Sequence, residues 1–434
     1  MYNEVFDQIG NSQPKLKIWL IKEGEDLPLL DNPRLMRMGS LAKYLSERGH
    51  SVVWWASTFI HGAKKYYINR YSTHRLNANE TLVLLHSDTY YKKNISLARI
   101  KYHRNLAGEF AKHSAEFETP DIIMCAWPTP QFAEAAVNYG EKHRIPVVLD
   151  IRDFWPDIYS RAFPKVLRPM GQLVLRLMKR SCSNTIKRAT GIVGKEMAAL
   201  EWGCRYAGRE SGENDTAIFI GNERVSISDE ELQNNLAWWK TKGVDEATWN
   251  MCFFSTLSLK SIDLETVIKA VLNLSRDYPD IRLIIGGKGD GEEHLRKVAG
   301  NSPNIVFGGW LNKDQMNSVM KISKCGLYCL KNTEDFKNTF TNKAIQYLPA
   351  GLPIINSLTG FAKQFLSENR IGITYSENDI SDCGEKIKSL YANETIRNAM
   401  ASNAETTFNN VFESSVVNQQ FENYFDRVVC NFKG

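Results

Sequence analysis

The chain has 434 residues, too many for one ordinary hydrophobic core, so we expect two domains. Hydrophobic residues make up 43% and charged residues 24% of the sequence, as in soluble globular proteins. The net charge of +5 favours anionic ligands only weakly and speaks against a nucleic-acid binder. No run approaches the roughly 20 apolar residues of a spanning helix. The polar N-terminus lacks the features of a secretory signal, so we expect a cytoplasmic protein.

The first half of the sequence alternates short apolar runs with amphipathic stretches. The expected strands cover residues 15–21, 51–56, 81–85, 121–126, 146–150, 191–193 and 217–220. The expected helices cover residues 34–48, 95–113 and 132–143, with a long helical pattern after residue 150. Strands that alternate with helices of this length predict a parallel sheet with both faces covered.

The second half repeats this alternation. Its expected strands cover residues 252–257, 281–286, 304–307, 326–330 and 353–356, and its expected helices cover 264–278, 292–298, 315–322 and 341–349. A polar, Trp-containing segment without a clear strand separates the two halves. We therefore predict an α/β protein with Rossmann-like domains over 1–222 and 251–412, a linker over 223–250, and a final helix within 413–434 that crosses back. Facing domains of this kind would line a ligand-binding cleft.

The eight cysteines are scattered, and we expect them to be buried free thiols of a reducing compartment. Cys325 and Cys329 share one face of an expected strand, but no His or second Cys pair accompanies them, as a metal site would require. The sequence also contains no Asp-x-Asp and no His-Glu-x-x-His pattern. We expect neither a metal nor a cofactor.

The short helix expected after strand 325–330 begins at Thr341 and Asn342. It carries Lys343 in its first turn and Gln346 one turn later. Free backbone N–H groups and the helix macrodipole make such a start an anion site. These parts suit a sugar nucleotide, with the diphosphate at the helix start and the ribose hydroxyls at the amide of Gln346.

A glycine-rich run, 286–291, lies between an expected strand and an expected helix. A dinucleotide site would need an acidic residue at the end of a following strand, and none is present. The run is either a loop that lets a nucleotide approach the backbone, with Gly287 and Lys288 as contacts, or a plain tight turn. Lys260, after the first strand of the second domain, is either a second diphosphate cation or a solvated loop lysine.

Three carboxylates and an arginine follow an expected strand of the first domain, at Asp150, Arg152, Asp153 and Asp157. A cluster at that place can position a sugar or polarise an acceptor hydroxyl. A structural Arg–Asp pair is the alternative.

Residues 158–195 include nine basic residues and no acidic one. At helical spacing, one arc holds Leu167, Met170, Val174, Leu177 and Met178, and the other holds Lys165, Arg168, Arg176, Lys179 and Arg180. A helix of this kind over 162–188 can lie on an anionic membrane. A helix that covers a sheet has a similar apolar arc, but the absence of acidic residues favours membrane contact.

The run from Thr341 to Ile355 resembles the PNK-x-x-EYL-x-x-GxPVI segment of glycosyltransferase family 4, whose members are retaining enzymes with the GT-B fold. Other segments resemble the bacterial surface-polysaccharide branch of that family, which builds O-antigen and capsule. They occur in the same order, at residues 34–39, 48–52, 54–61, 91–99 and 150–156. The likeness covers most of the chain.

The resemblance implies transfer of a hexosyl or N-acetylhexosaminyl group from a UDP-linked sugar to a glycan or a polyprenyl-diphosphate-linked acceptor. The transfer reaction would take place at the inner face of the cytoplasmic membrane and would not require a metal. Lys260 and Lys343 would stabilise the leaving diphosphate. Arg152 and Asp153 stand where many members carry a catalytic His, and Asp153 would orient the acceptor hydroxyl.

The resemblance also implies binding residues in both domains. The donor contacts would be Gly287, Lys288, Trp310, Asn338, Thr341, Asn342 and Gln346. The acceptor contacts would be Arg37, Gly39, His61, Asn94 and Arg99. Asn338 and Gln346 replace the two carboxylates of the family's Glu-x7-Glu pair, although the Gln346 carbonyl can still accept a ribose hydroxyl proton.

Two other classes of function remain open. A GT-B nucleotide-sugar epimerase or hydrolase needs a carboxylate or His pair around the sugar, which Asn338 and Gln346 do not supply. Product analysis without an acceptor would identify it. A catalytically silent binding protein is favoured only by the loss of both family carboxylates, and donor binding without turnover would identify that class.

Overall fold

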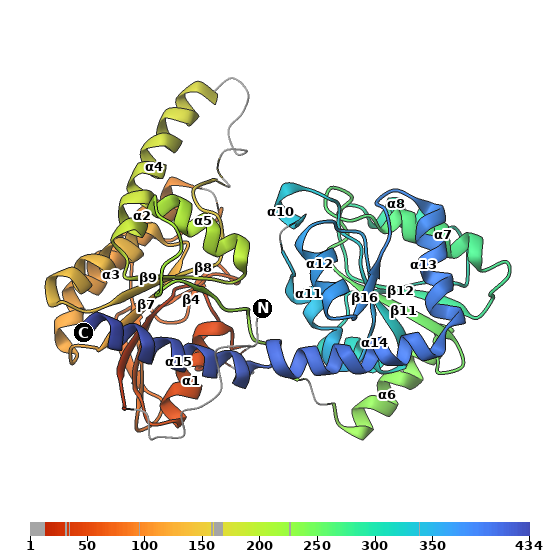
Figure 1. Cartoon of the computed structure of the whole chain (residues 1–434), viewed down its shortest axis with the longest axis horizontal. Helices are drawn as coiled ribbons and strands as arrows, with labels where there is room; N and C mark the ends of the chain where they lie inside the picture. Colours follow the sequence, from red (N-terminus) through yellow and green to blue (C-terminus); the bar gives the residue numbers. More distant parts are fainter. Residues whose placement is uncertain are drawn as a thin grey trace. The chain divides into compact units, whose positions relative to one another are not determined.

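The computed structural model describes residues 14–30, 33, 35–94, 96–157, 159, 168–224, 227–337 and 339–434. The chain forms two compact α/β units, which are coloured along the sequence in Figure 1. Unit 1 comprises Met1–Gly221 and Val417–Gly434, and unit 2 comprises Asn222–Val416. The segment 223–250, which we expected to link two domains, belongs to unit 2, where it forms α6 (Asp229–Lys240) and the start of β11 (Trp249–Phe254).

Unit 1 is built on one eight-stranded sheet in the order β10-β9-β8-β7-β1-β2-β6-β5. Every strand except β5 pairs in parallel. The strands are β1 (Lys17–Ile21), β2 (Ser51–Ser57), β5 (Ser72–Arg75), β6 (Glu80–Leu85), β7 (Ile122–Trp127), β8 (Val147–Ile151), β9 (Gly191–Gly194) and β10 (Thr216–Ala217). A separate short hairpin joins β3 (Phe59–Ile60) and β4 (Lys65–Tyr66). The parallel sheet predicted from the alternating pattern is confirmed.

Side chains on the central strand β1 alternate between the two cores of unit 1. Trp19 and Ile21 enter one core, and Ile18 and Leu20 enter the other. The covering helices are α1 (Arg37–Glu47), α2 (Leu97–His113), α3 (Pro130–His143), α4 (Arg168–Arg188), α5 (Met197–Ala207) and α15 (Ser414–Lys433). The last helix, α15, buries Phe421 and Phe425 in the core that also holds the apolar side chains of α1. The end of the chain therefore completes the unit in which it begins.

Unit 2 has a fully parallel six-stranded sheet in the order β13-β12-β11-β14-β15-β16. After β11, its strands are β12 (Ile281–Gly286), β13 (Ile305–Gly309), β14 (Ser323–Tyr328), β15 (Ile354–Asn356) and β16 (Gly372–Thr374). Its further helices are α7 (Leu264–Leu274), α8 (Glu292–Ala299), α9 (Lys313–Ile322), α10 (Glu334–Lys337), α11 (Asn342–Ile345), α12 (Phe361–Glu368), α13 (Ile380–Ala392) and α14 (Glu394–Thr407). This is the strand order of a Rossmann fold.

The helix expected over residues 341–349 is shorter than its pattern indicated. Helix α11 ends at Ile345, and a 3-10 turn, Leu348–Ala350, follows it. Pro349 has no N–H to continue an α-helix, and Gly351 then closes the turn with a φ of 64°. The chain passes from there directly into β15.

The cysteines are free thiols, and all except Cys430 are buried. Burial raises the pKa of Cys325 and of Cys329 well above the ordinary thiol value, so both stay protonated. In the described part of the chain, no group of three or more His, Cys, Asp or Glu side chains is placed to hold a metal ion. None of the described helices is long and apolar enough to cross a membrane.

Candidate functional site

The sheet of unit 2 reverses its strand order between β11 and β14. The chain runs from β11 outward to β12 and β13, and then returns past β11 to β14. Ligands of open α/β sheets bind beyond the carboxyl ends of the strands at such a point, because the two flanking loops turn away from each other there. The loops after β11 and β14 are therefore the first place to look for a ligand site.

Lys343 and Ser255 meet across this switch point. Ser255 directly follows β11, Lys343 lies in α11 beyond β14, and the Lys343 Nζ donates to the Ser255 Oγ at 2.5 Å. Lys343 is exposed as a residue, but its ammonium end lies against the loop after β11. Partial desolvation there lowers the pKa of Lys343. The contact places a cation, a hydroxyl and the start of α11 at one edge of the sheet.

The position of α11 is fixed by Tyr347, which is buried under the end of the sheet. A Cβ on Gly326 would lie 2.4 Å from the Tyr347 ring, so the glycine in β14 makes room for this aromatic side chain. The Tyr347 hydroxyl accepts the Phe254 N–H and donates to the Leu327 carbonyl, each at 3.3 Å. One side chain thus holds the segment that carries Lys343 to both β11 and β14.

The predicted donor residues around α11 differ in what they offer a ligand. Asn342 and Gln346 are half-buried, and Asn338 lies outside the described residues. The Thr341 N–H donates to the Tyr328 hydroxyl at 3.2 Å, but its own Oγ1 is buried without a hydrogen-bond partner in the described structure. A bound polar group at the start of α11 would satisfy that hydroxyl.

The glycine-rich loop after β12 packs against the loop after β11. A Cβ on Gly287, whose φ is 138°, would lie 1.8 Å from the Ser255 carbonyl oxygen. A Cβ on Gly289 would lie 2.3 Å from the Leu257 carbonyl oxygen. The Leu257 N–H donates to the Lys288 carbonyl at 3.0 Å. The close approach of the loop after β11 therefore requires glycine at both positions. Neither interpretation of the sequence, a nucleotide-binding loop or a plain tight turn, gave this reason.

Three further predicted residues are exposed at the same edge of the sheet. Trp310, which follows β13, has 76% of its surface exposed. Its predecessor Gly309 accepts the Gly287 N–H at 2.7 Å, so the tryptophan and the glycine-rich loop are neighbours. Lys260 and Lys288 are exposed on the loops after β11 and β12. The structure places these residues beyond the carboxyl ends of three adjacent strands.

In unit 1, the carboxylates predicted to cluster after β8 separate from one another. Asp150 is completely buried, Asp153 is exposed, and the Asp157 carboxylate accepts hydrogen bonds from Trp202 and Tyr206 at 2.8 and 2.9 Å. Successive residues at a strand end point in different directions, so nearness in sequence did not bring them together. The expectation of one shared site is wrong.

Arg37 is engaged inside unit 1 and does not support the predicted acceptor role. Its Nη1 lies 2.5 Å from the Asp150 Oδ1, and its Nη2 donates to the Ile218 carbonyl at 2.8 Å. Gly39 is buried in α1, where a Cβ would lie 3.2 Å from the Trp54 ring. Both residues hold α1 against the sheet.

Arg152 also belongs to this buried network. Its Nε donates to the Asp150 Oδ2 at 2.6 Å and its Nη1 contacts Glu25. The Glu25 Oε2 in turn accepts the Met38 N–H at 3.0 Å, near the start of α1. The predicted catalytic Arg152 is therefore held by Asp150 and Glu25, whereas Asp153 is exposed. The structural Arg–Asp pair, considered above as the alternative, is what the structure contains.

Replacing Asp150 by Asn is expected to lower the free energy of unfolding by about 3–5 kcal/mol, because Arg37 would be left buried without its counter-charge and Arg152 would keep only Glu25. Burial opposes the charged form of Asp150, but the two arginines outweigh it and lower its pKa below 3.8. Its contribution is therefore complete above that pH and is lost as the pH falls through the lower folded-state pKa.

Urea unfolding at neutral pH measures this effect. The matched control is Asp153→Asn, three residues along on the surface, which should change the free energy of unfolding by less than about 0.5 kcal/mol. Equal stability of the two variants would contradict the assignment of Asp150 to a buried ion network.

The other predicted acceptor residues do come together in unit 1. The His61 Nδ1 lies 2.6 Å from the Tyr91 hydroxyl. The Arg99 guanidinium donates to the Asn94 carbonyl at 3.1 Å and lies 5.2 Å from the Tyr91 ring centroid. Lys64, which sequence reasoning missed, donates to the Asn94 Oδ1 at 2.7 Å. Its place three residues after His61 is the one sequence signal that could have suggested it.

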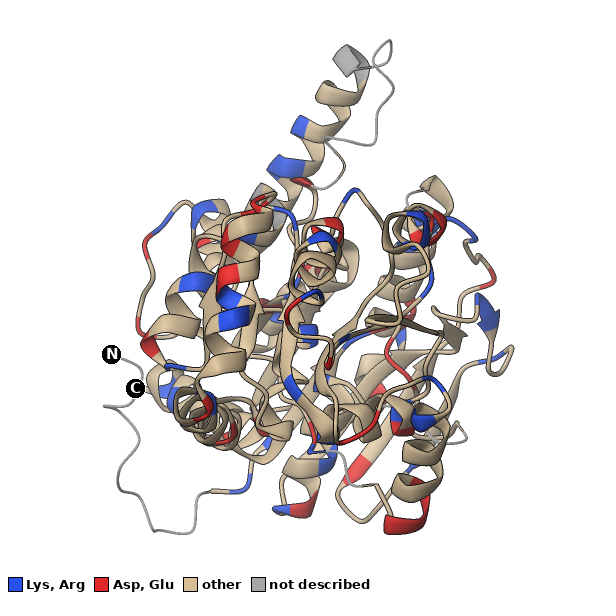
Figure 2. Cartoon of the chain, turned by 90° about the vertical axis from the view of Figure 1, so that its right-hand side faces the viewer, with Lys and Arg blue, Asp and Glu red and all other residues tan. Residues whose placement is uncertain are grey.

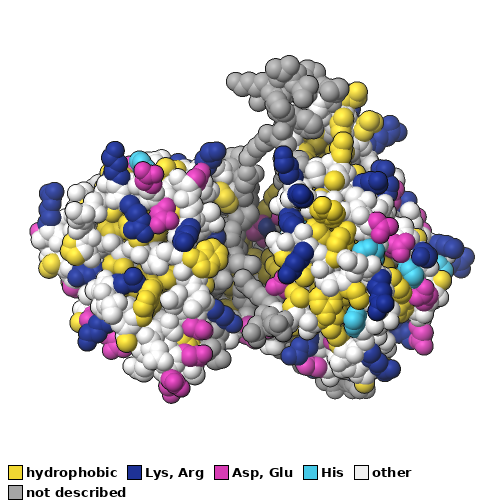
Figure 3. Space-filling model, turned by 180° about the vertical axis from the view of Figure 1, so that it is seen from behind, with side chains coloured by type: hydrophobic (Ala, Val, Ile, Leu, Met, Phe, Trp, Pro, Cys, Tyr) yellow, Lys and Arg dark blue, Asp and Glu magenta, His cyan; other side chains and the backbone are white. Residues whose placement is uncertain are grey.

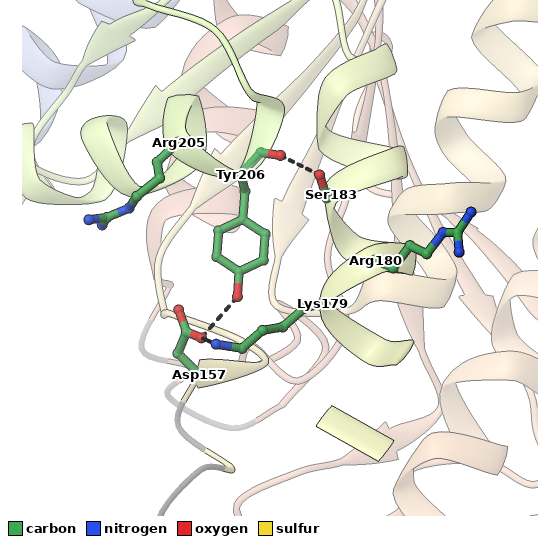
Figure 4. A pocket seen from close by; sticks show the side chains of 6 residues that line it. All are labelled: Asp157, Lys179, Arg180, Ser183, Arg205 and Tyr206. Atoms are coloured by element: carbon green, nitrogen blue, oxygen red, sulfur yellow. Dashed lines mark hydrogen bonds and ion pairs between the residues drawn. The ribbon is translucent and has the colours of Figure 1, made fainter. Parts of the chain in front are cut away.

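A hollow of about 620 Å³ lies between α4 and α5 of unit 1 (Figure 4). It is lined by Asp157, Lys179, Arg180, Ser183, Arg205 and Tyr206. The Lys179 ammonium pairs with Asp157 at 2.6 Å, while Arg180 and Arg205 point away from Tyr206 on opposite sides. The hollow is basic at its rim, but its polar centre is already satisfied by the chain itself.

Comparison with known proteins identifies the second unit. Residues 242–407 match the family model described as "Glycosyl transferases group 1". A search of curated proteins finds no match. The matched residues include β11 to β16 and every described candidate donor residue.

Solved structures match nearly the whole chain at low identity. Sucrose-phosphate synthase from Thermosynechococcus elongatus is 13% identical with a TM-score of 0.66, covering 96% of this chain and all of that one. The Anabaena protein HepE in complex with UDP is 14% identical with a TM-score of 0.63, covering 95% and 100%. Trehalose 6-phosphate synthase from Burkholderia multivorans is 12% identical with a TM-score of 0.66, covering 96% and 98%.

These structures share the architecture of two Rossmann-like units that the strand orders show here. The likeness extends over both units, whereas the sequence match is confined to the second. The chain therefore has the GT-B fold, and residues 242–407 of its second unit match the glycosyl transferases group 1 model.

Proposed function

We propose that the protein is a retaining glycosyltransferase that moves a hexosyl or N-acetylhexosaminyl group from a UDP-linked sugar. Its acceptor would be a glycan or a polyprenyl-diphosphate-linked saccharide in surface-polysaccharide synthesis. The group 1 match of the second unit and the fold shared with UDP-bound HepE support the donor class. The segments that resemble the surface-polysaccharide branch support the acceptor class.

The contact between Lys343 and Ser255 is the observation that carries the proposal. It places a cation at the switch point of the unit 2 sheet, where a bound anion would meet both flanking loops. A diphosphate there would take the Ser255 hydroxyl's place beside the Lys343 ammonium. Thr341 and Asn342 at the start of α11, together with Lys260 and Lys288, would complete its surroundings.

The rest of the nucleotide sugar would extend along the same edge of the sheet. The exposed face of Trp310 offers a stacking surface for the base, and the amide of Gln346 can accept a ribose hydroxyl. As the glycosidic bond breaks, negative charge grows on the leaving diphosphate. Lys343 and the start of α11 would stabilise that charge electrostatically, so the proposed mechanism uses neither a metal nor a covalent nucleophile.

The proposed acceptor site lies in unit 1, around His61, Asn94 and Arg99. Asp153 is the exposed carboxylate that would orient the acceptor hydroxyl. Arg152 would serve as a positioning residue, because its guanidinium is held by Asp150 and Glu25.

A panel of nucleotide-diphosphate sugars, incubated with the full chain and with lipid-linked saccharides, tests this function. We expect release of UDP that depends on the acceptor, and a product with the anomeric configuration of the donor. Hydrolysis or epimerisation without an acceptor would instead identify the alternative enzyme class. Donor binding without turnover would identify a silent binding protein.

The helix α4 carries the proposed membrane contact. It projects from the body of unit 1 in Figure 1, and Figure 2 shows basic residues along it. Leu173 and Leu177 of this helix are 58% and 62% exposed, and Val174 is also exposed. Figure 3 shows hydrophobic side chains on the projecting part of the unit from behind. The helix packs on unit 1 through a different stripe, which includes the buried Leu175 and Cys182.

This arrangement corrects the single apolar arc expected from the sequence. Val174 and Leu177 of that arc are exposed, Met178 is half-buried, and Leu167 lies outside the described residues. The exposed leucines stand beside the exposed cations Arg176 and Arg180. Apolar side chains flanked by cations suit an interface with anionic lipids.

We expect the double variant Leu173→Ser, Leu177→Ser to lose most binding to vesicles that contain anionic lipids, because insertion of exposed leucines supplies the apolar part of such binding. Co-sedimentation measures it. Ile396→Ser, which changes an exposed apolar residue on α14, is the matched control and should bind like the wild type. Unchanged binding of the double variant would refute membrane contact through α4.

A further inference from the structure

A group of cations surrounds Tyr91 in unit 1. The Lys64 Nζ lies 4.7 Å from the centroid of the Tyr91 ring, 3.3 Å from the His61 Nδ1 and 2.7 Å from the Asn94 Oδ1. Lys64 and Tyr91 are not among the binding residues that the family resemblance implied, although Tyr91 lies in the resembling segment 91–99. We call Lys64, Arg99, His61 and Tyr91 the Tyr91 cluster.

Arg99 completes this cluster from the first turn of α2. Its guanidinium carbon lies 5.2 Å from the Tyr91 ring centroid and 4.6 Å from that of Trp155. Its Nη1 donates to the Asn94 carbonyl at 3.1 Å. Two full positive charges and an imidazole therefore lie around one aromatic ring, held by parts of the chain that are far apart in sequence.

The carboxylate nearest to the cluster does not neutralise it. Glu23 is 1% exposed, and its Oε1 lies 3.3 Å from the His103 Nε2. Despite burial, the His103 hydrogen bond and the charges of Lys22 and Arg99 lower the pKa of Glu23, which is therefore ionised at neutral pH. Lys22, Lys64 and Arg99 carry three positive charges and Glu23 one negative charge, so the cluster together with its neighbours Lys22 and Glu23 has a net charge of about +2.

Crowding of like charges is visible in the individual side chains. Desolvation and the Arg99 charge lower the pKa of Lys64. Desolvation and the Lys64 charge likewise lower the pKa of His61. Cations that disfavour one another in the free protein gain when an anion binds among them, because the anion favours the charged form of each.

The cluster also lies where a ligand of this fold is expected. Glu23 follows β1, the strand at which the order of the unit 1 sheet reverses, and Trp155 follows β8. A Cβ on Gly24, whose φ is 81°, would lie 3.3 Å from the His61 Cβ, so the turn after β1 touches the cluster. The carboxyl ends of the parallel strands thus face the cations.

We propose that the Tyr91 cluster binds a phosphate group of the acceptor. A phosphate monoester carries about −1.5 to −2 charges at neutral pH, and a diphosphate esterified at both ends carries about −1 on each phosphate. Both match the net charge of about +2 better than the single charge of a sugar carboxylate does. Arg99 supplies planar paired donors and Lys64 a mobile point charge, the two kinds of cation that proteins use for phosphate. The inference rests on the proposed function only in calling this ligand an acceptor.

The shared chemistry has two possible sources, a soluble sugar phosphate and the diphosphate of a polyprenyl-linked saccharide. Inorganic phosphate and pyrophosphate are the first probes, titrated calorimetrically into the full chain. We expect Lys64→Ala to weaken their binding at least about tenfold, the loss of one charge-assisted contact. The control Lys65→Ala removes the adjacent exposed lysine and should leave the affinity unchanged.

Equal affinity of the wild type and Lys64→Ala for both probes, or no binding by the wild type, would overturn the proposal. Glucose 1-phosphate and vesicles that carry a polyprenyl diphosphate then separate the two sources. Binding of either one that is lost in Lys64→Ala supports the assignment. Transfer to a phosphate-bearing acceptor with the same kcat/KM in the wild type and in Lys64→Ala would also contradict it.

A separate titration keeps this test distinct from the proposed function. UDP should bind wild type and Lys64→Ala alike, because its proposed site lies in unit 2. Phosphate binding without UDP binding would leave the cluster assignment standing and refute the glycosyltransferase proposal. UDP binding and turnover, without any effect of Lys64→Ala on phosphate binding, would support the glycosyltransferase proposal and refute the cluster assignment.

Discussion

Replacing Lys343 by Ala is expected to lower kcat/KM for glycosyl transfer by a factor of about 10²–10³, the loss found when one preorganised donor to a developing negative charge is removed. The Lys343 ammonium is the cation that the fold places at the switch point of the unit 2 sheet. Initial rates of UDP release at subsaturating donor measure the effect. The unfolding free energy should change little, because Lys343 contributes one exposed contact.

Two further variants sharpen this prediction. Lys363→Ala removes an exposed lysine from α12 in the same unit and should keep the wild-type rate, so it controls for the loss of overall charge. Ser255→Ala removes the hydroxyl that Lys343 contacts in the free protein. If Ser255 only holds the lysine in place before the donor binds, this variant should lose much less activity than Lys343→Ala. Near-normal activity of Lys343→Ala would refute the proposal that Lys343 stabilises the leaving diphosphate.

Replacing Gly287 by Ala is expected to lower the free energy of unfolding by about 2–5 kcal/mol, the sum of backbone strain and overpacking. Its φ of 138° disfavours any side chain, and a Cβ would lie 1.8 Å from the Ser255 carbonyl oxygen. Relief of that clash must move the loop after β11 or the loop after β12. We therefore expect weaker UDP binding together with the lower stability.

Gly208→Ala separates the two causes. Gly208 also has a positive φ, 69°, but its ψ of 32° lies in the left-handed helical region and a Cβ there would meet no atom within 4 Å. That variant should lose only about 1 kcal/mol from backbone conformation and should keep its affinity for UDP. Urea unfolding and calorimetric titration of both variants measure the difference. A Gly287→Ala protein as stable as Gly208→Ala would contradict the close approach of the two loops.

The sheets of both units could be predicted from the sequence because hydrophobic periodicity is local. Each buried strand appears as an apolar run, and each covering helix shows its own spacing. Lys343 could be predicted as a binding residue from its place in a helix that follows a strand, whereas the strand order and its switch point come from the structure. The elements between Asn356 and the final helix were not predicted. Strand β16 has three half-buried residues and forms no apolar run, unlike the equally short β15, whose three residues are buried.

The ion network and the Tyr91 cluster could not be predicted in this way. Arg37 pairs with Asp150, 113 positions away, so no local pattern shows whether the arginine is buried or free for a ligand. The cluster likewise brings His61 together with Tyr91 and Arg99 of a later segment. The need for glycine at Gly287 arises from Ser255, which packs on it only in the folded unit. In each case the role of a residue is decided by a contact with another residue that is distant in sequence and close only in the folded unit.

For α4, the amphipathic sequence pattern predicts a helix but does not predict which of its apolar residues are buried. The sequence offers a helix with many apolar positions but does not say which of them face the sheet. The structure buries Leu175 and exposes Leu173 and Leu177, so the helix has one packed stripe and one exposed stripe. Only the second is available to a membrane.

The most direct test of the donor site is a calorimetric titration of UDP and UDP-sugars into the full chain, in the wild type and in Lys343→Ala. We predict that a UDP-sugar binds the wild type and that Lys343→Ala binds it at least about tenfold more weakly, since one charge-assisted contact is lost. At 100 times its Kd this ligand should also stabilise the wild type by about 2.7 kcal/mol. Absence of nucleotide-sugar binding to the wild type, or equal affinity in both proteins, would contradict the donor site at the switch point of unit 2.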